Sequence, residues 1–189
     1  MSPNNRIFKF ETLVQASSAL VYEAFTNATS LQEWLCDFAT VDPKPGGRIY
    51  LYWNSGFYTS GEYTELIPNE KVVFTWNGRN EPAATEIEVK LKRKKGGTLV
   101  QLAHKRVGVG AKWENVRREA MEGWQSSLEN LASVLATGED LRFLNRPMLG
   151  IGISDFNEDI AKHLNVPVTK GLRIDSVVDG MGAQAAGRQ

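Results

Sequence analysis

The residue types that most often carry chemistry are scarce in this chain. It contains two histidines, His104 and His163, and one cysteine, Cys36. A zinc site built from cysteine and histidine would need nearly all of them, and their spacing matches no metal motif. No serine, cysteine or acid stands at a recognisable spacing from His104, so no catalytic triad is indicated. We therefore expect no catalytic residue, metal or cofactor, although a metal site of carboxylates alone stays open.

Aromatic residues offer a different kind of chemistry, which is the lining of a cavity for a small molecule. They provide a large apolar wall with a few polar groups, as small-molecule pockets require. The candidate ligand-binding residues are Trp53, Tyr63, Trp76, His104, Trp113, Val116, Ala120 and Trp124. The alternative for each of them is ordinary core packing. Because both faces of residues 48–53 carry aromatic side chains, the pattern does not tell which face points inward.

His104 and Cys36 both have an alternative without chemistry. His104 alternates with Val100 and Leu102 on an apolar face, which favours a hydrogen-bonded interior histidine over a polar anchor or an acid-base group at the cavity. Cys36 ends an apolar helical segment and has no basic neighbour in sequence to lower its pKa. A buried structural thiol is therefore favoured over a nucleophile.

The elements that must position these residues follow from the hydrophobic periodicity. Alternation of period two predicts strands at residues 6–14, 48–53, 57–66, 72–76, 85–92 and 98–104. Two short helices are expected after the first strand. One is capped by Ser17 or Ser18, and the other begins near Ser30, which has capping-box spacing to Glu33. Short turns between successive strands indicate an antiparallel meander.

The longest helical pattern runs over residues 112–136, and Gly138 is its expected cap. Its apolar residues recur three or four positions apart and form one stripe, which needs a large surface to lie on. A sheet of five or six strands provides such a surface. The sequence therefore predicts an α+β fold, in which an antiparallel sheet wraps around one long C-terminal helix.

Five segments carry a resemblance to a known family over residues 6–136. They are Val21-Tyr-Glu-Ala-Phe-Thr, Leu31-Gln-Glu-Trp-Leu, residues 61–76, Gly97-Thr-Leu-Val-Gln-Leu-Ala-His, and the helix from Trp113 through Trp124 to Leu131. In this order they resemble the activator-of-heat-shock-ATPase-homologue branch of the START-like (SRPBCC) superfamily. The resemblance implies a helix-grip fold, in which a curved antiparallel sheet grips the long helix over an internal cavity.

The same resemblance implies three functions of different classes. We favour a non-enzymatic binding module that holds a small hydrophobic or amphipathic ligand between the sheet and the long helix. One alternative is a cavity-type enzyme, because polyketide cyclases share the superfamily and work largely by shaping a cavity around a reactive substrate. The other is a co-chaperone that stimulates a heat-shock ATPase, with the chaperone as its partner. No feature of the sequence supports the co-chaperone independently.

The C-terminal residues have a pattern of their own. They resemble the first part of a PDZ domain of the bacterial protease-associated kind, with Leu149, Gly150 and Ile151 in the place of the carboxylate-binding loop and its strand. That family binds the C-terminus of a partner there, by adding the peptide as a strand. We expect a START-like domain at residues 1–137, a linker at 138–146 and an incomplete PDZ-like segment at 147–189.

Composition and charge exclude several further classes. The chain has 189 residues, 42% of them hydrophobic, and 22 basic residues balance 22 acidic ones. Residues 90–118 nevertheless hold ten of the bases and one acid, with five bases between Lys90 and Lys95. No aromatic residue interleaves this run, so a solvated hairpin is favoured over nucleic-acid binding. With no membrane span, no signal peptide and a single cysteine, we expect a cytoplasmic protein.

Overall fold

The computed structural model describes residues 6–146 and 148–187, and the chain divides into two compact units, Met1–Leu144 and Asn145–Gln189. The elements of the first unit are β1 (Arg6–Val14), α1 (Ser18–Thr26), α2 (Ala28–Trp34), β2 (Phe38–Val41), β3 (Arg48–Tyr52), β4 (Tyr58–Ile67), β5 (Lys71–Gly78), β6 (Thr85–Lys94), β7 (Gly97–Val107), the 3-10 turn η1 (Ala111–Trp113), α3 (Glu114–Thr137) and α4 (Leu141–Leu144). No helix in the described part of the chain has both the length and the apolar character that crossing a membrane requires.

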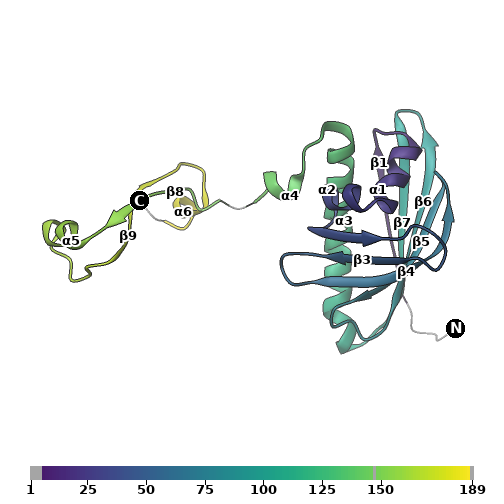
Figure 1. Ribbon diagram of the computed structural model, residues 1–189, viewed down its shortest axis with the longest axis horizontal. Coiled ribbons are helices and arrows are strands. Elements are labelled where there is room, and N and C mark those ends of the chain that lie inside the picture. Colours follow the sequence, from purple (N-terminus) through teal and green to yellow (C-terminus); the bar gives the residue numbers. More distant parts are fainter. Residues whose placement is uncertain (1–5, 147, 188–189) are drawn as a thin grey trace. The chain divides into compact units, whose positions relative to one another are not determined.

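The strands of the first unit form one antiparallel sheet in the order β1-β7-β6-β5-β4-β3-β2. The sheet has seven strands rather than the five or six expected, and β2 is the element that the periodicity missed. In Figure 1, β3 and β4 run nearly at right angles to β6 and β7, so the sheet is strongly coiled. This coiling gives the sheet a concave side, and the predicted α+β architecture is confirmed.

One residue, Asn27, separates and shapes the two short helices. Its backbone N–H closes α1 by donating to the carbonyl of Glu23, and its Oδ1 accepts from the N–H groups of Thr29 and Ser30 at 2.9 and 3.1 Å. The second helix therefore begins two residues before the expected start near Ser30, because its cap is Asn27 rather than Ser30. The predicted cap of the first helix is confirmed, since Ser17 Oγ accepts from Leu20 N at 3.3 Å.

The long helix α3 supplies the centre of the core. Trp124, Leu128 and Leu131 are buried and lie three to four residues apart, so one stripe of the helix faces the concave side of the sheet. Gly138 ends the helix with φ +80°, and its N–H donates to the carbonyl of Val134. The left-handed conformation costs glycine little, so the predicted cap is confirmed.

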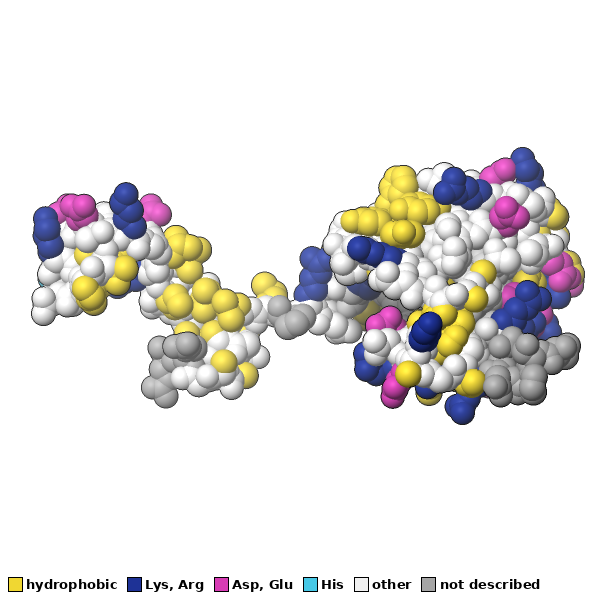
Figure 2. Space-filling view, turned by 90° about the horizontal axis from the view of Figure 1, so that it is seen from below, with side chains coloured by type: hydrophobic (Ala, Val, Ile, Leu, Met, Phe, Trp, Pro, Cys, Tyr) yellow, Lys and Arg dark blue, Asp and Glu magenta, His cyan; other side chains and the backbone are white. Residues whose placement is uncertain are grey.

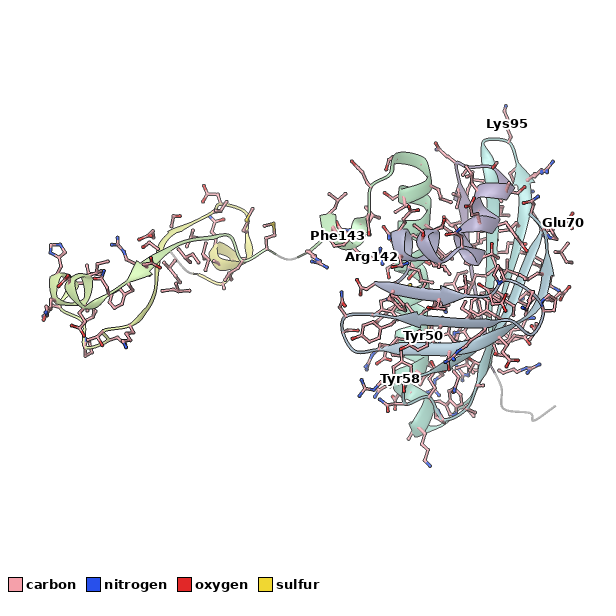
Figure 3. The ribbon with its side chains drawn as sticks, in the orientation of Figure 1. Tyr50, Tyr58, Glu70, Lys95, Arg142 and Phe143 are labelled. Atoms are coloured by element: carbon pink, nitrogen blue, oxygen red, sulfur yellow. The ribbon has the colours of Figure 1, made fainter. Side chains whose placement is uncertain are left out.

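The structure also settles which face of the central strands points inward. Ile49 and Leu51 of β3 are buried in the core, whereas Tyr50 lies on the other face. The Tyr50 ring stacks on Tyr58 of β4, with ring centroids 6.1 Å apart, and Figure 3 shows the two side chains together. Trp53 continues the inward parity of Leu51, and this places it next to the core.

The segment after α3 is held against the first unit, although it was expected as part of a linker. Arg142 of α4 donates from Nη1 to the carbonyl of Cys36 at 3.0 Å and from Nη2 to the carbonyl of Gln32 at 2.7 Å. The same guanidinium pairs with Asp140 at 2.7 Å. Figure 3 labels Arg142 where α4 follows α3. The division between the units accordingly falls after Leu144.

The basic run lies on the β6–β7 hairpin. Lys95 stands at its tip, at the edge of the first unit in Figure 3. Further along the same outer face, Glu88 of β6 accepts ion pairs from Lys71, Lys90 and Lys105 at 3.7, 3.3 and 2.9 Å. Adjacent acidic residues thus offset part of the positive charge, as expected for a solvated sheet face.

The second unit contains β8 (Ile151–Phe156), α5 (Glu158–Leu164), β9 (Gly171–Val177) and α6 (Gly182–Ala185). The two strands pair antiparallel. Asn157 caps α5, and its Oδ1 accepts from two backbone N–H groups. Most of its large apolar side chains are exposed, and Figure 2 shows them gathered at its surface. A unit this small buries little apolar surface by itself.

Candidate functional site

A cavity of about 280 Å³ lies in the first unit between the sheet and the N-terminal half of α3. Its volume is just below the range of roughly 300–1,000 Å³ that is usual for small-molecule pockets, so it suits a small ligand. The lining residues are Leu35, Trp53, Ser55, Phe57, Trp76, Glu81, His104, Val116, Glu119, Ala120, Gly123, Trp124 and Ser127. Ser55, Glu119 and Gly123 are exposed, and they mark where the cavity meets solvent.

Six of the eight candidate residues meet at this cavity. Trp53, Trp76 and His104 line it from the sheet, and Val116, Ala120 and Trp124 line it from α3. They meet because the structure turns these strand positions inward, toward the apolar stripe of the helix. The sequence alone did not tell which strand face points inward.

The other two candidates, Tyr63 and Trp113, do not line the cavity. Tyr63 is fully buried, and its hydroxyl donates to the carbonyl of Phe25 in α1 at 2.9 Å. It therefore belongs to the filled part of the core beneath the short helices. Trp113 ends η1, and its indole lies against Gly108, where an added Cβ would come within 2.3 Å of Nε1. This contact turns the ring toward the loop before the helix.

The wall of the cavity is a cluster of aromatic rings. The ring centroids of Trp53 and Trp76 are 6.2 Å apart, those of Trp76 and Trp124 are 5.4 Å apart, and Phe57 lies 5.4 Å from Trp53. All three indole N–H groups donate to protein acceptors: the carbonyl of Leu35, Glu81 Oε1 and His104 Nδ1. The rings are thus held in place, and a ligand meets their apolar surfaces.

His104 is a hydrogen-bonded interior histidine. Trp124 Nε1 donates to its Nδ1 at 3.2 Å, so the ring proton lies on Nε2, which donates to Thr85 Oγ1 at 2.7 Å. Thr85 donates in turn to the carbonyl of Trp76 at 3.1 Å. Burial lowers the pKa of His104 to about 4, which keeps the ring neutral. Both ring nitrogens are engaged, so this arrangement leaves no free nitrogen for acid-base work.

Glu81 is the polar group that the cavity leaves unsatisfied. It lies in the loop between β5 and β6, and its Oε1 accepts from Trp76 Nε1 at 2.9 Å. Its Oε2 is buried without a hydrogen-bond partner among the described residues. Burial raises the pKa of the carboxyl, hydrogen bonding from Trp76 and from the backbone of Gly78 opposes this shift, and the nearby charge of Glu119 adds to it.

The described lining of the cavity contains acidic side chains but no basic ones. Glu81 and Glu119 both line the cavity, and none of the described lining residues is lysine or arginine. Ser55 and Ser127 are the remaining polar side chains besides His104. The cavity therefore combines an aromatic wall with two acidic side chains and, among its described residues, no basic one.

Sequence reasoning missed Glu81, the group that gives the site its polarity. It follows the turn at Arg79 and Asn80 that ends β5, and no motif marks it as buried. The one available signal is that an acid comes five residues after an inward-facing tryptophan, across a turn that brings the chain back to the same strand. Phe57 also lines the cavity, but its sequence pattern indicates only the start of a strand.

Among the described residues of the first unit, the thiol and the possible metal ligands form no second site. Cys36 is fully buried, and burial raises its pKa to about 12, which suits a structural thiol rather than a nucleophile. Within residues 6–146 and 148–187, no three side chains of histidine, cysteine, aspartate or glutamate gather closely enough to hold a metal ion.

In the second unit, the three candidate peptide-binding residues precede or begin β8. The carbonyl of Leu149 accepts from Ala183 N, and that of Gly150 accepts from Val178 N, both at 2.8 Å. Ile151 opens the strand and pairs with Val177. Gly150 has φ +65°, and a Cβ there would meet the side chain of Met181. The backbone of this segment is therefore tied to α6 and to the residue after β9.

Comparison with known proteins gives one family. The family model described as "Activator of Hsp90 ATPase homolog 1-like protein" matches residues 15–136. The mouse protein "Activator of 90 kDa heat shock protein ATPase homolog 2" is 30% identical over 110 residues, which are 57% of this chain. The match spans only 31% of the length of that relative.

Solved structures agree with the fold of the first unit. A protein from Mesorhizobium loti has a TM-score of 0.63 at 20% identity, covering 71% of this chain and 99% of its own. The Aha1 dimer from Colwellia psychrerythraea has a TM-score of 0.62 at 22% identity, covering 71% and 98%. At these identities the similarity shows the fold alone, and that fold agrees with the helix-grip expectation.

Proposed function

The chain belongs to the family of Activator of Hsp90 ATPase homolog 1-like proteins, and from this premise we propose that its first unit is a binding module for a small amphipathic ligand. The observation that carries the proposal is the cavity of about 280 Å³, which is walled by aromatic rings and lined also by Glu81, whose Oε2 is buried without a partner among the described residues. Protein interiors are normally close-packed, and buried polar atoms are normally paired. A ligand with an apolar body and one polar group would satisfy both rules.

Position 123 allows a test that fills the cavity without harming the helix. Gly123 lines the cavity from α3, and a Cβ added there meets nothing within 4 Å. Gly123→Leu should place a side chain in the ligand space, whereas Gly123→Ala is the matched control. Both replace glycine by a good helix former, so both should stabilise the helix by about 0.5–1 kcal/mol.

Native mass spectrometry after gentle purification, with thermal shifts across a panel of lipids and aromatic metabolites, gives the readout. We expect the wild type and Gly123→Ala to retain or bind a ligand, and Gly123→Leu to lose it. A wild-type protein that stays empty and shows no shift with any compound would contradict the proposal. So would equal binding by both variants.

A second candidate function, a cavity-type enzyme of the polyketide cyclase kind, is favoured by Glu81 itself. A carboxyl whose pKa is raised by burial, inside an open aromatic pocket, is a competent general base when ionised. Turnover of 5-nitrobenzisoxazole tests this. The base takes the ring C–H proton while the N–O bond breaks, and the product is a coloured cyanophenolate. Catalysis in the wild type that disappears in Glu81→Gln would favour the enzyme, and no rate above that of free carboxylate would dismiss it.

A co-chaperone role comes from the family alone. The mouse relative is named as an activator of a 90 kDa heat shock protein ATPase, and this chain spans under a third of its length. An ATPase assay of that chaperone with the present chain tests the role, and an unchanged rate would remove it. A cytoplasmic location likewise stays a prediction.

For the C-terminal part, we propose a PDZ-like segment at residues 147–189 in which Leu149, Gly150 and Ile151 receive the C-terminal carboxylate of a partner protein. The support is the hydrogen-bonded backbone around Gly150 and the short antiparallel sheet that follows it. Fluorescence anisotropy with a labelled peptide that ends in valine tests this proposal. The free carboxylate should bind and the C-terminal amide should not, so equal binding would refute it.

A further inference from the structure

The two oxygens of the Glu81 carboxyl have different surroundings. Oε1 accepts from Trp76 Nε1, whereas Oε2 is buried without a partner. Among the described residues, Thr59 Oγ1 is the other buried side-chain atom without a partner, and Thr59 is not among the residues that line the cavity. An unmade hydrogen bond at a buried acceptor costs about 1–3 kcal/mol, more for a charged group. The Glu81 carboxyl, in the lining of the cavity, therefore lacks one hydrogen-bond donor.

The protein does not meet this demand with a cation of its own. None of the described residues that line the cavity is lysine or arginine, and Glu119 adds a second negative charge at the mouth. His104 is also no source of positive charge, because burial lowers its pKa to about 4. The missing donor would be favoured most if it carried a positive charge, since charge-assisted hydrogen bonds are roughly twice as strong as neutral ones.

The aromatic wall fits the same kind of group. Cations are attracted to the faces of tryptophan rings within about 6 Å of the ring centroid. Trp53, Trp76 and Trp124 form such a wall beside Glu81, and the N–H group of each is already bonded to the protein. The rings thus offer π-faces and apolar area, and Glu81 offers the acceptor.

We propose that the cavity selects a protonated primary or secondary amine on a small aromatic or apolar body, with an ammonium N–H donating to Glu81 Oε2. The inference rests on the proposed binding function and adds the class of ligand. A quaternary ammonium lacks the N–H that Oε2 needs, and a carboxylate would be repelled by Glu81 and Glu119. The rings of Trp53 and Trp76 contact the apolar body of the ligand and lie close enough to its ammonium group for a cation–π attraction.

Three probes of nearly equal size separate the headgroup from the body: benzylamine, benzyl alcohol and benzoate. NMR titration of the wild-type chain, followed at the tryptophan indole N–H resonances, gives a dissociation constant for each. We expect benzylamine to bind about tenfold more tightly than benzyl alcohol, because a hydrogen bond to a charged partner exceeds a neutral one by this order. Benzoate should bind most weakly.

Glu81→Gln keeps an acceptor for Trp76 Nε1 and removes the charge, so the preference for benzylamine over benzyl alcohol should fall to about one. Glu70→Gln is the matched control. Glu70 is exposed and lies outside the lining of the cavity, at the far edge of the sheet in Figure 3, and its loss should leave the preference unchanged. Gly123→Leu should weaken all three probes together.

The outcomes separate this inference from the function on which it rests. Equal binding of benzylamine and benzyl alcohol would overturn the ammonium preference while leaving a ligand site in place. Tightest binding of benzoate would overturn it too, because Glu81 would then act as a protonated donor. A preference that survives in Glu81→Gln would also overturn it. Ligand retention in native mass spectrometry judges the binding function independently of these probes.

Discussion

The two halves of α3 differ in how completely the side chains around them are packed and hydrogen-bonded. Toward its C-terminal end, Leu128 and Leu131 are buried, and the buried amide of Asn130 is satisfied on both sides. Its Nδ2 donates to the carbonyl of Trp34 and to Asp140, and its Oδ1 accepts from Leu141 N. Toward the N-terminal end, the small residues Ala120 and Gly123 line a cavity in which the Glu81 carboxyl keeps an unpaired oxygen.

This difference separates two uses of one helix. The filled half stabilises the fold, because Leu128 and Leu131 are packed in the core and the buried amide of Asn130 is paired. The N-terminal, hollow half lies beside an unfilled cavity and a carboxyl oxygen without a hydrogen bond, and both features are unfavourable for stability. Proteins keep such locally unfavourable features mainly at functional sites. The contrast along α3 predicts that damage to the filled half costs stability, whereas changes in the hollow half alter binding.

The sharpest test of the contrast truncates one apolar residue in each half. Leu131→Ala removes a fully buried side chain and should lower the free energy of unfolding by about 3–4 kcal/mol. Val116→Ala, at the cavity, should cost under about 1 kcal/mol, because the residue is half-buried and its removal only enlarges existing space. Urea unfolding of both variants measures the difference. Equal losses would show that the two halves are packed alike.

The pH dependence of stability tests the satisfied polar group at the cavity, His104. Its pKa lies near 6.5 when unfolded and at about 4 when folded, so the unfolded chain binds the proton first. The stabilisation is complete above pH 6.5 and is lost as the pH falls to about 4, a change of about 3 kcal/mol.

His104→Gln controls for the other titrating groups. The variant shares every carboxylate with the wild type, so the difference between their unfolding curves isolates the histidine. It should unfold more easily at pH 7 and lose less additional stability between pH 6.5 and pH 4. Parallel curves over this window would mean that His104 is not held neutral by burial.

Asn130→Ala breaks the paired amide of the filled half. It leaves the carbonyl of Trp34 and the N–H of Leu141 without their partners, which should cost about 2 kcal/mol in the free energy of unfolding. Gln125→Ala, on an exposed position of the same helix, should change stability by under about 0.5 kcal/mol. Thermal unfolding compares the two variants, and a similar effect of both would remove the special role of the amide.

The smallest expected effect has the opposite sign. Because burial raises the pKa of Glu81, the wild type loses stability as the pH rises from about 4.5 through the folded pKa. Glu81→Gln should therefore be more stable than the wild type at pH 7, by on the order of 1 kcal/mol, and equal to it at low pH. A destabilised variant at pH 7 would show that Oε2 of Glu81 has a partner in the folded protein.

Local sequence patterns predicted the elements that are long or strongly periodic. The strand at residues 6–14, the long helix α3 and the cap at Gly138 were found because their signals lie within each segment. The strand β2 was missed because its four residues become a strand only by pairing with β3. The cap at Asn27 was missed because Ser30 and Glu33 offered a competing signal three residues later.

The site was predictable to the extent that it follows from parity and helical spacing. Trp76 and Trp124 meet because both lie on inward-facing positions, and six of the eight candidates line one cavity. Tyr63 has the same inward parity, but parity does not tell where along a strand the core is filled. Glu81 depends on how a loop folds back over Trp76, and no periodicity describes that.

The three indoles at the cavity also make the protein its own optical probe. Trp53 and Trp76 are inclined by 55°, and Trp76 and Trp124 by 58°, at ring separations of 6.2 and 5.4 Å. Chromophores this close and this obliquely oriented couple their electronic transitions, which gives paired bands of opposite sign in circular dichroism. Any molecule that enters between the rings and Glu81 would shift these bands and the tryptophan emission. Occupancy of the cavity can therefore be followed in unlabelled protein, with Trp53→Phe as the variant that removes one member of the coupled set.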